Sequence, residues 1–89
     1  MRRRYLIAGR VQGVGYRYFT RRAAGQLGVN GWVRNLPGGQ VEAEGQGSPE
    51  ALAAFEAELR RGPSGSLVTE FAVTEISDEA EDVNAFVIR

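Results

Sequence analysis

A glycine-rich segment that leads into an arginine is the strongest chemical signal in this 89-residue sequence. Gly9, Gly13 and Gly15 fall between an apolar segment and a predicted helix. Backbone amides in such a turn can converge on an anion, and the start of a helix adds a partial positive charge. A plain tight turn would use the same glycines, because glycine readily adopts positive φ. The spacing alone therefore leaves both interpretations open.

Arg17 favours the anion-binding interpretation. It falls in the first turn of the predicted helix, where a cation opposes the helix dipole by about 0.3–1 kcal/mol. An arginine beside converging amides leaves positive charge uncompensated unless an anion binds, and its planar guanidinium suits a bidentate contact with phosphate. The alternative is a solvated side chain that points away from the loop.

Asn35 is the second polar candidate. It ends a predicted strand directly before the turn at Leu36 and Pro37. A carboxamide both donates and accepts hydrogen bonds, so Asn35 could hold a water molecule. The alternative is that Asn35 only caps the turn that follows.

The missing residue types narrow the chemistry further. The sequence has no cysteine, no histidine and no lysine. This excludes thiolate nucleophiles, cysteine- or histidine-bound metals, the usual serine–histidine–aspartate relay and Schiff-base chemistry. Any catalysis must use arginine, backbone amides, carboxylates, carboxamides or hydroxyls.

The zero net charge hides an asymmetry along the chain. Residues 1–41 contain eight arginines and no acid, whereas residues 42–89 contain all eleven acids and three arginines. The two halves therefore carry +8 and −8. A basic half suggests an anionic ligand, either a small phosphate or a nucleic acid. The alternative is that the two halves pair their charges across a sheet.

Hydrophobic periodicity and turn residues predict the elements that must position these groups. We expect strands at residues 4–9, 31–35, 41–46, 67–76 and 85–89, with an acidic turn at 78–82 before the last strand. We expect helices at 17–27 and between Ser48 and Gly62. Phe19, Ala23 and Leu27 form the apolar stripe of the first helix, and Leu52, Phe55 and Leu59 form the buried stripe of the second. On the fourth strand we expect Phe71 and Val73 to face inward.

The hairpin made by strands 31–35 and 41–46 has a predictable register. Matching the apolar faces places Asn35 opposite Val41 and Val33 opposite Ala43 on the core side. Arg34 then meets Glu42, and Trp32 meets Glu44, on the solvent side.

This order of elements predicts a ferredoxin-like, split β-α-β sandwich with a short fifth strand. Two helices would pack on one face of an antiparallel sheet, and residues 1–89 would form a single domain. No apolar run reaches the length of a membrane span, and the apolar start is too short for a signal peptide, so we expect a cytoplasmic location.

Two motifs resemble a known family. Residues 9–17, GRVQGVGYR, and residues 31–35, GWVRN, closely resemble the acylphosphatases, and the resemblance covers essentially the whole chain. It implies that Arg17 binds phosphate, that Asn35 positions the attacking water and that both are catalytic. It also implies a small cytoplasmic monomer that needs no metal or cofactor. The cradle amides implied by the resemblance, together with Arg17, make up the expected phosphate site: Gly9, Arg10, Val11, Gln12, Gly13, Val14 and Arg17.

The expected reaction is hydrolysis of an acyl phosphate to a carboxylate and inorganic phosphate, with phosphate as a competitive inhibitor. One alternative is an RNA-binding module of the same topology, but strand 41–46 has no aromatic residue and two acids, so we expect no nucleic-acid partner. Another is a non-catalytic sensor of a phosphorylated metabolite, which would need Arg17 but not Asn35.

Overall fold

The computed structural model describes residues 1–77 and 84–89; the acidic turn predicted at 78–82 lies outside the described residues. All the predicted elements are present, with ends that differ by at most a few residues. In chain order they are β1 (Arg2–Arg10), α1 (Tyr16–Leu27), β2 (Asn30–Asn35), β3 (Val41–Gln46), α2 (Pro49–Arg61), β4 (Leu67–Ile76) and β5 (Phe86–Ile88).

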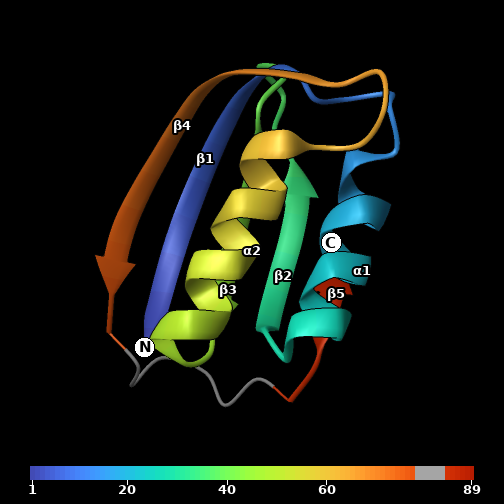
Figure 1. Cartoon of the computed structure of the whole chain (residues 1–89). Coiled ribbons are helices and arrows are strands. Elements are labelled where there is room, and N and C mark those ends of the chain that lie inside the picture. The colour runs from blue at the N-terminus through green and yellow to red at the C-terminus, as the bar shows by residue number, and fades with distance from the viewer. Residues whose placement is uncertain (78–83) are drawn as a thin grey trace.

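The strands form one sheet in the order β4-β1-β3-β2-β5, and both helices lie on the same face of it (Figure 1). This confirms the predicted ferredoxin-like fold. The first four strands pair antiparallel, but β5 pairs with β2 in parallel, so the five-stranded sheet is mixed rather than wholly antiparallel. The parallel pairing matters for the site, because it brings Ile88 of β5 close to the start of α1 and the end of β2, where the candidate groups lie.

The predicted register of the β2–β3 hairpin is confirmed at all four pairs. The solvent-side assignment is wrong in one respect, because Trp32 and Glu44 are only 5% and 4% exposed. They lie on the face away from the helices, where the guanidinium groups of Arg34 and Arg89 stack over the indole of Trp32. Arg2 and Arg4 bind the carboxylate of Glu44. Long arginine side chains therefore cover a face that alternation alone assigns to solvent.

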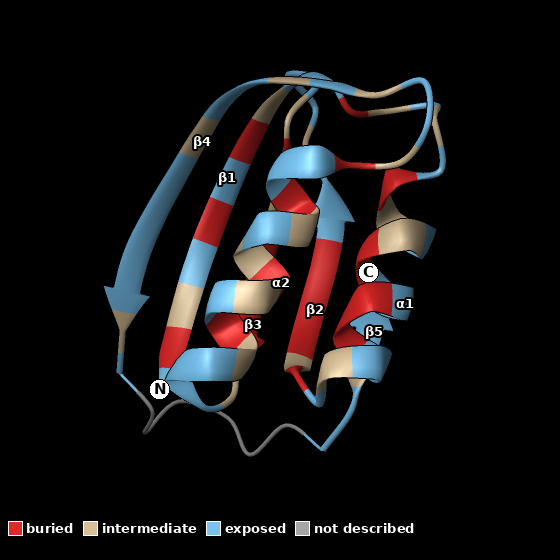
Figure 2. Cartoon of the chain, viewed as in Figure 1, coloured by how far each residue is buried: buried red, intermediate tan, exposed pale blue. Residues whose placement is uncertain are grey.

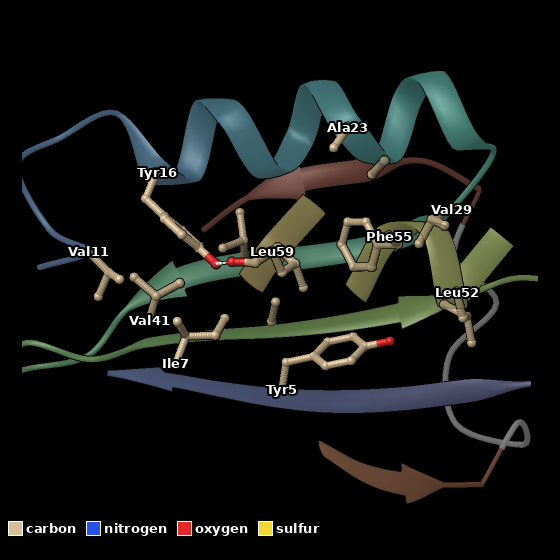
Figure 3. Packing of buried hydrophobic residues seen from close by; sticks show 13 residues of the cluster. Tyr5, Ile7, Val11, Tyr16, Ala23, Val29, Val41, Leu52, Phe55 and Leu59 are labelled. Carbon is tan, nitrogen blue, oxygen red and sulfur yellow. Dashed lines mark hydrogen bonds between the residues drawn. The ribbon is translucent and has the colours of Figure 1, made fainter. Parts of the chain in front are cut away.

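The hydrophobic core lies between the sheet and the helices (Figures 2 and 3). Leu52, Phe55 and Leu59 of α2 are fully buried, as predicted. On α1 the prediction was only partly right, because Tyr16 and Thr20 are buried whereas Phe19 is half-buried. The hydroxyl of Tyr16 donates to the Leu59 carbonyl oxygen and that of Thr20 to the Tyr16 carbonyl oxygen, so both polar groups are satisfied inside the core.

The edge strand β4 is mostly exposed (Figure 2). Phe71 packs against the core, as predicted. Val73 lies opposite Tyr5 and thus on the helix side, as predicted, although it stays 39% exposed. Strand alternation identified its face correctly, but a residue is buried only where another element covers that face.

Charge pairing across the fold accounts for half of the basic N-terminal segment. Arg2 and Arg4 pair with Glu44, Arg3 pairs with Glu56 and Glu75, and Arg34 pairs with Glu42. Burial alone would raise the pKa of Glu44, but hydrogen bonds from Arg2 and Arg4 outweigh burial and hold its pKa below the usual range. Four of the eight arginines in residues 1–41 are thus neutralised by acids from the second half of the chain.

Candidate active site

A cavity of about 320 Å³ lies where the loop after β1 meets the start of α1, the end of β2 and strand β5. It brings Arg17 and Asn35 together, although they come from different elements. Its walls are made by Val11, Gly13, Gly15, Tyr16, Arg17, Tyr18, Arg21, Asn35 and Ile88.

The start of α1 lacks the features that normally stabilise a helix start. Gly15 occupies the N-cap position with φ of 78°, and no side chain caps the first turn. The first turn contains no acidic residue. Gly13, two residues earlier, also has positive φ, at 75°. This conformation is accessible to glycine at little cost, and it leaves the first amides of α1 directed toward the cavity end of the helix.

The charge of the cavity is positive. Arg17 and Arg21 both line it, and no aspartate or glutamate from the described ranges 1–77 and 84–89 is among its lining residues. No carboxylate of residues 1–77 or 84–89 lies within ion-pair distance of either guanidinium. The helix start adds further positive potential. The cavity therefore has the electrostatics of an anion site.

Asn35 is placed by a hairpin turn that does not depend on its side chain. The Leu36 amide donates to the Gln40 carbonyl oxygen at 2.8 Å, and the Gly39 amide donates to the Leu36 carbonyl oxygen. The Asn35 side chain is exposed and makes no hydrogen bond to any residue within 1–77 or 84–89. The carboxamide is therefore free to bind a water molecule or ligand.

Gln12 joins the glycine-rich loop to this turn. Its Nε2 donates to the Leu36 carbonyl oxygen at 2.8 Å and to the Gln40 carbonyl oxygen at 2.9 Å. These two bonds fix the loop against the hairpin that carries Asn35. The relative position of the two candidate groups is thus set by a direct contact.

Tyr16 fixes the start of α1 to the core and to α2. Its side chain is 1% exposed, and its hydroxyl donates to the Leu59 carbonyl oxygen at 2.6 Å (Figure 3). Burial raises the pKa of the Tyr16 phenol well above its usual value. Tyr16 therefore stays neutral and anchors the first turn of α1 to the last turn of α2.

The predicted phosphate-binding residues fall into two groups. Val11 and Gly13 line the cavity, with Gln12 and Val14 between and beside them in the same loop. Gly9 and Arg10 instead belong to β1 and pair with Val68 and Leu67 of β4. At Gly9 an added Cβ would lie 2.0 Å from the Leu67 carbonyl oxygen, so only glycine fits where β1 and β4 approach this closely.

Five residues that line the cavity were not among the predicted site residues: Gly15, Tyr16, Tyr18, Arg21 and Ile88. Gly15 was predicted as part of the glycine spacing but not as part of the phosphate cradle. Arg21 lies four residues after Arg17, a spacing that places both on one side of a helix and could have identified it. Ile88 carries no local signal, because the parallel pairing of β5 with β2 brings it to the cavity.

No group of three or more potential metal ligands occurs within residues 1–77 and 84–89. In the same part of the chain, neither helix is long and apolar enough to cross a membrane.

Comparison with known proteins identifies the family of this arrangement. The acylphosphatase family model matches residues 3–88. The chain belongs to the acylphosphatase family. An acylphosphatase of Bifidobacterium longum is 45% identical over 89 residues, which are all of this chain and 92% of the relative. One from Methanothrix thermoacetophila is 44% identical over 79 residues, 89% of this chain and 88% of the relative.

A solved acylphosphatase confirms the fold at this level of detail. The crystal structure of acylphosphatase from Bacillus subtilis superimposes with a TM-score of 0.94 at 39% identity, covering 99% of this chain and 97% of the other. Family membership makes the chain a hydrolase of the acylphosphatase type with a small acyl phosphate as its class of substrate.

Proposed function

We propose that residues 1–89 form one acylphosphatase domain whose cavity hydrolyses the carboxyl–phosphate anhydride bond. The loop amides of residues 9–14 and the Arg17 guanidinium hold the phosphoryl oxygens, and Asn35 positions the attacking water. The observation that supports this most strongly is the placement of Arg17. It lies beside an uncapped helix start, has no carboxylate partner within residues 1–77 and 84–89, and shares one cavity with Asn35.

The proposed reaction needs few groups from the protein. Water attacks phosphorus, the bond from phosphorus to the bridging oxygen breaks, and the carboxylate leaves with the bonding electrons. Because a carboxylic acid has a pKa of about 4, the leaving group needs no proton from a general acid. Arg17 and the amides stabilise the charge on the phosphoryl oxygens as it redistributes in the transition state. The proposal therefore requires neither a metal nor a cofactor.

The proton of the attacking water goes to a phosphoryl oxygen of the substrate. No carboxylate of residues 1–77 or 84–89 lines the cavity, and the sequence contains no histidine. The Tyr16 phenol is unsuitable as a base, because burial keeps it neutral and its hydroxyl already donates to Leu59. The substrate itself is the remaining acceptor, and its phosphoryl oxygens lie next to the water.

The remaining properties follow from this arrangement. Inorganic phosphate, as the product, competes with substrate for the cavity. All groups of the proposed site come from one chain, so we propose that the protein is a monomer. We also propose a cytoplasmic location. We propose no nucleic-acid partner, because Arg34 and Arg89 cover Trp32 and acids occupy the neighbouring strand β3.

The test is hydrolysis of benzoyl phosphate, followed by the loss of its ultraviolet absorbance, with 4-nitrophenyl phosphate as the monoester control. We expect turnover of benzoyl phosphate that EDTA leaves unchanged, and far slower turnover of the monoester, whose leaving group is poorer. Equal rates on the two substrates, or loss of activity in EDTA, would overturn the proposal.

A further inference from the structure

Arg21 is a second cation in the cavity that the proposed reaction does not use. It lies one turn after Arg17 on α1, so the two Cα positions are about 6 Å apart along the helix axis. Both side chains line the same cavity. Like charges at this spacing destabilise a helix. Placing both there is favourable only when anionic groups face them.

The acids of residues 1–77 and 84–89 leave Arg21 without an ion pair. Arg2, Arg3, Arg4 and Arg34 are all paired with glutamates, whereas no carboxylate of residues 1–77 or 84–89 pairs with Arg21. One anion at the glycine-rich loop would compensate Arg17 and the helix start. Arg21, a full turn away from the loop, would still face the cavity without a partner.

The surroundings of Arg21 hold it at the wall of the cavity. Its guanidinium carbon lies 4.9 Å from the centre of the Tyr18 ring, and both residues line the cavity. Tyr18 is 68% exposed, so it is not a core residue. Stacking on the ring restricts the arginine while leaving its N–H groups free to bind. Ile88 lines the same cavity and adds an apolar surface.

We propose that Tyr18, Arg21 and Ile88 form a subsite for the acyl part of the substrate, in which Arg21 binds a second anionic group. This inference rests on the proposed function, in which the phosphoryl group occupies the loop and Arg17. The acyl portion extends along α1, its carbon atoms against Ile88 and Tyr18 and its anionic group on the Arg21 guanidinium. The preferred substrates are therefore acyl phosphates whose acyl portion carries its own negative charge, such as a carboxylate.

The test compares three benzoyl phosphates that differ at one ring position: 4-carboxybenzoyl, the neutral 4-carbamoylbenzoyl of similar shape, and unsubstituted benzoyl phosphate. The measured quantity is the ratio of kcat/KM for the carboxylated substrate to kcat/KM for the carbamoyl substrate. The variants are Arg21→Gln, the conservative Arg21→Lys, and Arg22→Gln as the matched control. Arg22 is the next residue on the same helix, is exposed, and does not line this cavity.

We expect the ratio to fall about 5- to 10-fold in Arg21→Gln, mainly through a higher KM for the carboxylated substrate. A group far from the reacting bond is bound equally well in the ground state and in the transition state, so its loss changes KM more than kcat. Arg21→Lys should recover part of the ratio, and Arg22→Gln should leave it unchanged. Raising the salt concentration should lower the wild-type ratio, because an ion pair at an exposed site is screened.

Two results separate the failures. If wild type hydrolyses benzoyl phosphate but Arg21→Gln keeps the wild-type ratio, or Arg22→Gln lowers it equally, the subsite is wrong and the proposed function stands. If wild type hydrolyses none of the three substrates, the proposed function is wrong and the subsite with it. Thermal unfolding of each variant shows whether the exposed substitutions leave the fold intact.

Discussion

Helix α2 begins with the groups that stabilise a helix start, whereas α1 begins with none of them. The Ser48 hydroxyl accepts a hydrogen bond from the Ala51 amide, Pro49 occupies the first turn, and Glu50 adds a negative charge there. Arg60 and Arg61 occupy the last turn. Each of these features matches the helix dipole or an unpaired backbone group.

The start of α1 differs at each of these points. Gly15 caps it without a side-chain hydrogen bond, Arg17 replaces an acid in the first turn, and the last turn has no basic residue. What holds α1 in place is packing, through buried Tyr16 and its bond to α2, and a glycine C-cap at Gly28. The difference indicates that stability at the start of α1 has been exchanged for a site that attracts an anion.

Of the changes at the start of α1, Arg17→Gln should have the largest effect on turnover. Without the guanidinium, charge on the phosphoryl oxygens is no longer stabilised, so turnover of benzoyl phosphate should fall about 10³-fold or more. Affinity for inorganic phosphate should weaken by about 10- to 100-fold, measured by calorimetry. Unchanged phosphate affinity would mean that Arg17 points into solvent and that the loop is only a turn.

Asn35→Ala should separate catalysis from binding. If the carboxamide positions water, turnover should fall by about 10²- to 10³-fold, while phosphate affinity stays within a few-fold because the loop and Arg17 remain. Since backbone bonds already close the turn, we expect little change in thermal unfolding. A folded variant with full turnover would favour a sensor, or another anchor for the water.

Gln12→Ala should have a smaller effect that depends on position rather than charge. The variant loses both hydrogen bonds to the hairpin, so the loop and Asn35 are no longer held together. We expect turnover to fall about tenfold, since small misplacements of reacting groups are costly, and the free energy of unfolding to fall by about 1–2 kcal/mol. If stability falls but turnover does not, Gln12 braces the fold without positioning the site.

The smallest effects concern stability at the two helix starts. Ser48→Ala removes the cap of α2, so the free energy of unfolding should fall by about 1 kcal/mol with turnover unchanged. Arg17→Gln should instead raise it by about 0.3–1 kcal/mol in buffer without phosphate or sulfate, because it removes a cation from the positive end of α1. Urea unfolding measures both, and a loss of stability in Arg17→Gln would contradict the contrast between the helices.

Local patterns were sufficient to predict the elements and the hairpin register. Alternation fixed Val33 opposite Ala43, and Ser48 with Pro49 marked the start of α2. Burial on the outer face of the sheet could not be predicted, because Trp32 is covered by Arg89, which is distant in sequence. Alternation placed Val73 on the correct face, but it could not predict the 39% exposure of this residue on the edge strand.

The site was predictable to the extent that it is local. The glycine loop and Arg17 form one continuous motif, and Asn35 ends a second motif, GWVRN at residues 31–35. Resemblance to the family therefore identified Arg17 and Asn35. Ile88 reaches the cavity only through the parallel pairing of β5 with β2. The Gln12 contacts with the hairpin are also long-range, and no spacing in the sequence indicates them.

The most direct test of the contrast between the two helix starts is a titration of the 15N-labelled protein with inorganic phosphate, followed by amide chemical shifts. We predict saturable shifts at Gly13, Gly15 and Arg17, and none at the Glu50 and Ala51 amides at the start of α2. Loss of the α1 shifts in Arg17→Gln at the same phosphate concentration would support it further. Shifts of equal size at both helix starts, or none at the start of α1, would contradict it.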